Sequence, residues 1–292
     1  MKTLLPIYAL LFSFCLFSCQ KESQTPDYTN MMPTPVALKI NTTTFQSFSD
    51  VESQISKMDM YIFMKLSSNS EYTFEKRVEN FSLDHSLYSF QLLGKFPRKF
   101  YFIANNLTGK ITYLDNINST TTSADFEMNC LLKETAIPQS PFPMFAQTEI
   151  NQLAENNQIE VGLSFALAKI TINYKYNGFT PDSIIIRSAI PSTYLFNTSI
   201  PNENIAPRQD VRYAVGEPIY MNQNNQSTLT VYGKYDGIKT VLDIPLNEIK
   251  KSTQYTVTVR GLNDNQFDFG KNFTYEIQQW NIGSTVESQP EW

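Results

Sequence analysis

The sequence has little cysteine, histidine or glycine, and each shortage excludes a class of site. Of its 292 residues, 3 are Cys, 1 is His and 10 are Gly. Cys15 and Cys19 lie in the N-terminal segment, so the rest of the chain holds only Cys130 and cannot form an internal disulfide. The single histidine, His85, cannot build a His-rich metal site or a Ser-His-Asp triad. No Gly-rich phosphate-binding loop is present either, and we expect no enzymatic activity, metal or cofactor.

Long apolar runs and blocks of basic charge are also missing. The longest apolar segment, Leu4–Phe17, is shorter than the ~20 residues that a helix needs to cross a bilayer. The chain has 23 Lys+Arg against 28 Asp+Glu and no basic cluster that could neutralise a phosphate backbone, so nucleic acid is not an expected partner. No stretch keeps a period near 3.6 over three turns, which argues against a helical fold.

The N-terminus has the layout of a secretory signal. Lys2 precedes the apolar segment Leu4–Phe17, and the small residue Ser18 stands before Cys19. The sequence Leu16–Cys19 (LFSC) resembles the bacterial lipoprotein signal, which is cut before the cysteine, here between Ser18 and Cys19. In such proteins the cysteine carries fatty acyl groups such as palmitate, which implies a lipid anchor in the outer membrane. The alternative is an ordinary cleaved signal with an incidental Cys19.

The segment after the signal is polar and contains several prolines. Residues 19–35 cannot bury enough apolar surface to order themselves, so we interpret them as a flexible tether. Gln20–Glu22 partly resembles the signal that sends Bacteroidetes lipoproteins to the cell surface. We therefore expect display on the outside of the outer membrane.

The rest of the chain has the composition and periodicity of an all-β protein. It contains 21 Phe and 16 Tyr, and β-branched and aromatic residues favour strands. Asp236-Gly237 predicts a hairpin turn, and the three prolines in Ile137–Met144 exclude a central strand there. Phe100–Ala104 is apolar on both faces and Met58–Phe63 nearly so, and both predict central strands, whereas Tyr72–Phe81 predicts an edge strand. Further strands are predicted at Val36–Ile40, Tyr88–Leu92, Ile184–Ile186, Leu229–Tyr232, Val241–Ile244, Tyr255–Val259, Phe273–Ile277 and Ser284–Glu287.

One long strand-like stretch changes phase. Apolar residues share one parity from Ile159 to Leu167 and the other from Ile170 to Tyr176. Because a one-residue slip turns every side chain to the opposite face, the slip predicts a β-bulge or a crossing between two sheets. A turn follows at Asn177-Gly178, which we take as a domain boundary. The prediction is a β-sandwich in residues 36–177 and a second one in residues 178–292.

With these strands placed, the sequence resembles the fimbrillin superfamily of Bacteroidetes. The resemblance implies two transthyretin-like antiparallel β-sandwich domains in tandem and a structural role as a fimbrial (pilus) subunit or anchor. It also implies adhesion to a host or bacterial surface ligand. Besides the lipoprotein signal, the similar segments are Met60–Phe63, Phe100–Asn105, Leu167–Ile170 preceded by Pro143-Met144, and Tyr275–Gly283.

The resemblance also implies a mechanism of assembly. In polymerising members, a trypsin-like protease removes an N-terminal strand, and a strand from another subunit fills the vacant groove. Here Val36–Ile40 would be removed, and Ser284–Trp292 is a candidate donor. No arginine lies between Cys19 and Lys76, so Lys39 or Lys57 would have to serve as the cleavage site. The missing arginine favours an uncleaved, lipid-held anchor.

Two further features suggest that the protein carries or binds sugars. Asp182-Ser183-Ile184 resembles the Bacteroidetes O-glycosylation sequon, which makes Ser183 a candidate modification site; so short a motif also arises by chance. Tyr194 and Tyr213 lie in a loop-rich region and, if exposed, could stack on sugars. The alternative function is therefore a surface lipoprotein that binds glycans without polymerising. Asp264 and Asp268 lack the spacing of a calcium-binding loop.

Overall fold

The computed structural model describes residues 32–41, 54–55, 57–68, 70–81, 87–106, 110–133, 137–138, 140–153, 157–175, 178–261 and 273–281. Strands dominate these ranges, which contain one short α-helix, α2 (Ser123–Asn129), so the all-β prediction is confirmed. None of the described helices is long and apolar enough to cross a membrane. The predictions for Ser18, Cys19, His85, Asp264, Asp268 and Ser284–Trp292 lie outside the described residues.

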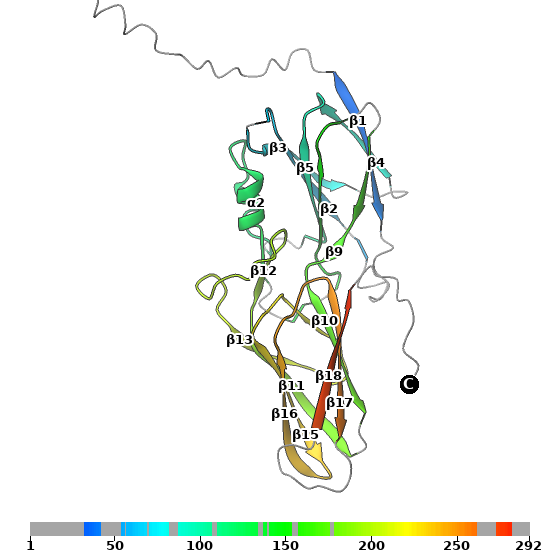
Figure 1. The fold of residues 1–292 in the computed structure, drawn as a ribbon, viewed down its shortest axis with the longest axis vertical. Helices are drawn as coiled ribbons and strands as arrows, with labels where there is room; N and C mark the ends of the chain where they lie inside the picture. The colour runs from blue at the N-terminus through cyan, green and yellow to red at the C-terminus, as the bar shows by residue number, and fades with distance from the viewer. Residues whose placement is uncertain are drawn as a thin grey trace, which may run out of the picture. The chain divides into compact units, whose positions relative to one another are not determined.

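Two sheets enclose the first hydrophobic core. Their inward residues form one buried cluster, so the sheets pack face to face as a sandwich. The five-stranded sheet is antiparallel, in the order β3 (Thr73–Phe81), β2 (Met58–Met64), β5 (Arg98–Ala104), β7 (Met144–Ile150) and β9 (Ser164–Phe165). The three-stranded sheet has the order β4 (Leu87–Leu93), β1 (Pro33–Asn41) and β8 (Asn157–Gly162), seen in part in Figure 1.

Burial follows the predicted positions of the strands in the five-stranded sheet. β2 and β5 lie inside the sheet and are buried on both faces, whereas β3 lies at its edge and is only partly buried. On the face away from the three-stranded sheet, the helix α2 supplies Phe126, whose ring contacts Tyr61, Phe63 and Tyr101. The two central strands are therefore largely apolar on both faces because a sheet covers one face and a helix the other.

The helix α2 escaped the sequence analysis because it is only two turns long. A capping box marks its start: the Thr122 hydroxyl accepts the Asp125 N–H at 3.1 Å, and the Asp125 carboxylate accepts the Thr122 N–H at 3.3 Å. Only Ser123 and Phe126 of its residues are buried. Two buried positions are too few to produce a recognisable helical period.

The change of phase between Leu167 and Ile170 marks a place where the chain crosses from one sheet to another. The stretch that reads as one long strand contains β8, then β9, then β10 (Ala168–Lys175), and each of these strands lies in a different sheet. Leu167 packs in the first core cluster and Ala168 in the second. Of the two predicted explanations, the crossing is correct. The division of the chain into two domains at Asn177-Gly178 stays a prediction, since Pro33–Trp292 forms one compact unit.

Two four-stranded sheets enclose the second core cluster. The predicted hairpin between β15 (Ser227–Tyr235) and β16 (Ile238–Leu246) is confirmed (Figure 1), since Asp236 (φ 47°) and Gly237 (φ 81°) both have the positive φ that a tight hairpin turn requires. One sheet has the order β14 (Ile219–Met221), β10, β17 (Thr253–Gly261) and β18 (Phe273–Asn281). The other has the order β13 (Gln209–Tyr213), β11 (Phe179–Ala189), β15 (Ser227–Tyr235) and β16 (Ile238–Leu246). The short strands β6 (Leu131–Lys133) and β12 (Ser192–Tyr194) form a separate pair.

Two ladders depart from the antiparallel pairing of the other strands. β1 pairs in parallel with β8, and β10 pairs in parallel with β17. Each of these ladders joins strands that are distant in the sequence. Because no tight turn connects them, nothing in the local sequence fixes their direction.

A half-buried lysine holds part of the irregular backbone. The Lys251 ammonium donates to the carbonyl oxygens of Tyr194 (2.7 Å), Leu195 (2.6 Å) and Asn197 (3.0 Å), and it lies 4.5 Å from the centre of the Phe145 ring. Burial lowers the pKa of Lys251 to about 8. The lysine thus supplies a donor to three carbonyl groups at the end of β12 and in the connection that follows it.

Asn105 ends β5 and explains the last residue of the segment Phe100–Asn105. Its φ is +56°, a left-handed conformation that asparagine tolerates better than most residues. Its side-chain amide donates to the carbonyls of Gln54 (2.8 Å) and Phe142 (2.9 Å), and its backbone N–H donates to Lys57 (2.8 Å). Asn105 therefore joins three segments at the end of the central strand.

We predict that Asn105→Ala lowers the free energy of unfolding by about 3 kcal/mol, because it leaves two carbonyls without donors and strains the backbone. Asn106→Ala is the matched control and should change the free energy by no more than about 0.5 kcal/mol. Urea unfolding followed by circular dichroism measures both. Equal effects of the two substitutions would contradict the role given to Asn105.

Candidate functional site

The candidate site is the place that β1 occupies in the three-stranded sheet. β1 is antiparallel to β4, with seven paired positions from Pro33↔Leu93 to Lys39↔Leu87. On its other edge it is parallel to β8, from Val36↔Asn157 to Asn41↔Gly162. Within the described residues neither β4 nor β8 pairs with any other strand. We call the place between them the β1 slot, because without β1 both neighbours would lose their ladders.

The side chains of β1 alternate between the core and the surface. Thr34, Val36 and Leu38 are buried, with Leu38 at 0% exposure, whereas Pro35 and Lys39 are exposed. Burying an aliphatic side chain of this size contributes about 1.5–3 kcal/mol. The β1 slot therefore has an apolar floor for alternate residues and unsatisfied backbone groups on both walls when it is empty.

The observed start of β1 corrects the expected end of the tether. β1 begins at Pro33, not at Val36, so residues 33–35 belong to the sheet. Prolines suggested a tether because proline donates no ladder hydrogen bond. The structure accommodates them because Pro33 and Pro35 pair only with β4, and the ladder to β8 begins at Val36.

The two candidate processing residues occupy different places. Lys39 lies inside β1, between its partners Leu87 and Glu160, and its ammonium is 3.3 Å from the Glu160 carboxylate. Both side chains are well exposed, so this ion pair contributes little stability. Lys57 is exposed and directly precedes β2, and its carbonyl accepts the Asn105 N–H. A cut after Lys39 would divide β1, whereas a cut after Lys57 would leave it whole.

Arg77 is unsuited to cleavage for a reason that the sequence did not reveal. It lies in β3 and donates to the buried Asp59 carboxylate at 2.8 Å, and its guanidinium lies 5.1 Å from the centre of the Tyr61 ring. It is therefore a structural residue of the five-stranded sheet.

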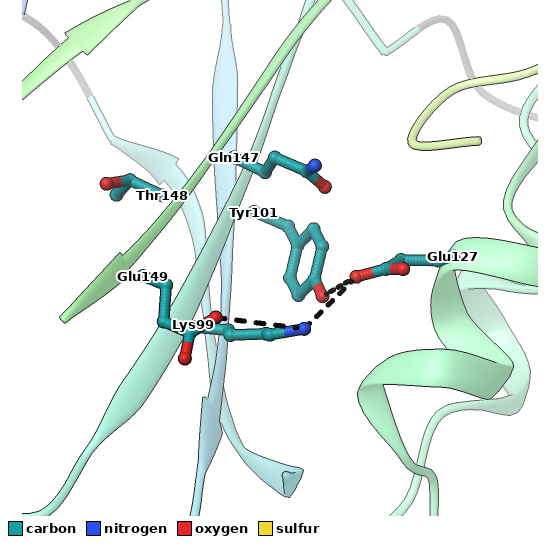
Figure 2. Close-up of a pocket in the computed structure, with 6 residues that line it drawn as sticks. All are labelled: Lys99, Tyr101, Glu127, Gln147, Thr148 and Glu149. Carbon is teal, nitrogen blue, oxygen red and sulfur yellow. Dashed lines mark hydrogen bonds and ion pairs between the residues drawn. The ribbon is translucent and has the colours of Figure 1, made fainter. Parts of the chain in front are cut away.

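A separate polar hollow of about 210 Å³ lies between β5, β7 and α2 (Figure 2). In this hollow the Lys99 ammonium lies 3.5 Å from the Glu127 carboxylate and 4.0 Å from the Glu149 carboxylate. The Tyr101 hydroxyl donates to the Glu127 carboxylate at 2.5 Å. Burial and the neighbouring Glu127 raise the pKa of Tyr101 far above its ordinary value. These groups satisfy one another, and the network covers the sheet beside α2 without offering a reactive group. Gln147 and Thr148 complete the lining.

The residues proposed to carry or bind sugars lie in three different strands. Ser183 is half-buried in β11 beside a register shift at Asp182, and it pairs with Tyr232 of β15. Its glycosylation stays a prediction. Tyr213 does not meet the condition of exposure that sugar stacking requires: its side chain is 7% exposed and its hydroxyl donates to the Tyr220 carbonyl at 2.8 Å. Tyr194 is half-buried in β12.

The described residues contain no cluster of three or more His, Cys, Asp or Glu side chains that could hold a metal ion. Cys130 is fully buried, as expected for a small apolar residue, and burial raises the pKa of its thiol well above the ordinary value.

Comparisons with known proteins relate this fold to fimbrial proteins. A scan of protein-family models found no match, and neither did a search of curated proteins. Among solved structures, the tip fimbrial protein Mfa3 from Porphyromonas gingivalis, in a C-terminally truncated form, matches with a TM-score of 0.59 at 16% identity. That match covers 85% of this chain and 100% of the other. A fimbrial assembly protein from Parabacteroides distasonis matches with a TM-score of 0.58 at 14% identity, covering 85% and 99%. The structural neighbours are thus Bacteroidetes fimbrial proteins, and the chain shares their all-β fold.

Proposed function

We propose that the protein is a structural subunit or anchor of a cell-surface fimbria and that the β1 slot accepts a strand from another subunit. The single observation that carries the proposal is the place of β1 between β4 and β8, which have no other described partners. A strand donated by another subunit would restore both ladders and refill the places of Val36 and Leu38. The fimbrial names of the structural neighbours support the same role.

The lipid on Cys19 would hold the protein in the outer membrane, on the outer face of the cell. Ser284–Trp292 is the candidate strand for donation to a further subunit. Adhesion to a host or bacterial surface would follow from display on a fimbria. The alternative, a glycan-binding surface lipoprotein, has less support because Tyr213 and Tyr220 of the loop-rich region are buried.

The test of strand acceptance uses a cleavable chain, in which a site for a specific protease is inserted in residues 42–50. After cleavage, β1 is held only by noncovalent contacts. A fluorescent peptide with the sequence of Pro33–Asn41 should then replace β1, because the β1 slot matches its register and its apolar positions. Fluorescence anisotropy measures the uptake, and a peptide of Ser284–Trp292 is compared in the same assay.

The control is the Pro33–Asn41 peptide carrying Val36→Asp and Leu38→Asp, which should fail to bind because it buries two charges. The uncleaved chain should take up neither peptide. Equal uptake of the two Pro33–Asn41 peptides, or no uptake at any concentration, would refute the β1 slot as an acceptor.

The proposed anchor makes a separate prediction. Protein extracted from outer membranes should have the mass of a chain that begins at an acylated Cys19, and Cys19→Ser should release the protein from the membrane fraction. Intact-mass analysis and fractionation measure both. An unmodified Cys19 in membrane-bound protein would rule out lipid attachment, and a terminus just after Lys39 or Lys57 would identify a processed, polymerising subunit.

A further inference from the structure

Two carbonyl groups of β4 accept hydrogen bonds from distant cations. They belong to Leu93 and Gln91, which pair with Pro33 and Pro35 of β1. Proline has no N–H, and the Pro35 carbonyl accepts from the Asn157 side chain of β8 at 3.4 Å. The Leu93 carbonyl accepts from Arg98 at 2.6 Å, and the Gln91 carbonyl accepts from the Lys76 ammonium at 3.0 Å.

Both cations belong to the five-stranded sheet. Lys76 lies in β3 and Arg98 begins β5. Arg98 is fully buried, forms an ion pair with Glu75 (2.7 Å) and also donates to the carbonyls of Gly94 (3.2 Å) and Phe96 (3.1 Å). It therefore fixes the connection between β4 and β5 as well as the end of β4.

Aromatic contacts attach the middle of β4 to the same sheet. The ring of Tyr88 lies 4.7 Å from that of Phe81, and the ring of Phe90 lies 6.5 Å from that of Phe100. The Lys76 ammonium lies 5.8 Å from the centre of the Phe90 ring. None of these contacts involves β1, so all of them can persist when β1 leaves.

We propose that Lys76 and Arg98 are positioning residues that hold β4 against the five-stranded sheet while β1 is absent. They keep one wall of the β1 slot in place for the incoming strand, a role that rests on the proposed function.

The test uses Lys76, because truncating the buried Arg98 would leave Glu75 as an unpaired charge and unfold the protein. Lys76→Met keeps the aliphatic stem over Phe90 but removes the donor to Gln91. Lys76→Arg restores a donor and should restore the wild-type behaviour. Lys65→Met is the matched control, since the Lys65 ammonium lies over the Tyr72 ring and not against β4.

In the cleavable chain after cleavage, Lys76→Met should slow uptake of the Pro33–Asn41 peptide about tenfold. Without the Lys76 hydrogen bond, β4 spends a smaller fraction of the time in the position in which it can pair with the incoming peptide. Chymotrypsin should also cut after Tyr88 or Phe90 about tenfold faster in this variant. Before cleavage of the chain, thermal unfolding and chymotrypsin resistance should match those of the wild type, because β1 then holds β4.

The two assays separate the possible failures. If the wild type takes up no peptide, the proposed function fails, and the chymotrypsin rates still decide whether Lys76 holds β4. Chymotrypsin rates that are equal in Lys76→Met and wild type after cleavage would overturn the positioning role. So would an equal change in Lys65→Met, which would indicate a general effect of removing a lysine.

Discussion

A strand in the middle of a sheet must satisfy backbone groups on both of its neighbours, and in this protein that requirement falls on β1. β4 and β8 have no other described strand partner, so the three-stranded sheet depends on a segment near the N-terminus of the described chain. Unpaired backbone groups beside an apolar floor are costly. The same dependence makes β1 replaceable, because any strand that supplies those bonds and fills the positions of Val36 and Leu38 restores the sheet.

A second recurring feature is the use of cations as hydrogen-bond donors to carbonyl groups in the connections and near the ends of strands. Arg98 binds the carbonyls at the end of β4 and in the following turn, Lys251 binds three carbonyls between residues 194 and 197, and Arg208 binds those of Ser188 and Gln226. Cys130 is the free cysteine of the described residues. Long connections are thus held by charge-assisted hydrogen bonds to backbone and not by cross-links.

The sequence contained enough information for most strands because their periodicity is local. Phe100–Ala104 is apolar on both faces and Met58–Phe63 nearly so, and both proved central; Asp236-Gly237 specified its hairpin. The helix α2 was too short to show a period, and the direction of β8 beside β1 depends on a long-range crossing. In the site, the strand at Val36–Ile40 was predicted from its alternating residues, and the family resemblance implied its removal. The contacts of Lys76 and Arg98 with β4 could not be predicted, because nothing in the local sequence identifies a carbonyl as the partner of a distant cation.

The central claim is that β1 must leave its place for a partner strand to enter. Ala37 and Ser89 face each other across β1 and β4, so cysteines at both positions can lock the two strands with a disulfide that dithiothreitol reopens. In the cleavable chain after cleavage, the oxidised form should take up no Pro33–Asn41 peptide and the reduced form should take it up. Equal uptake by the oxidised and reduced forms would contradict the account.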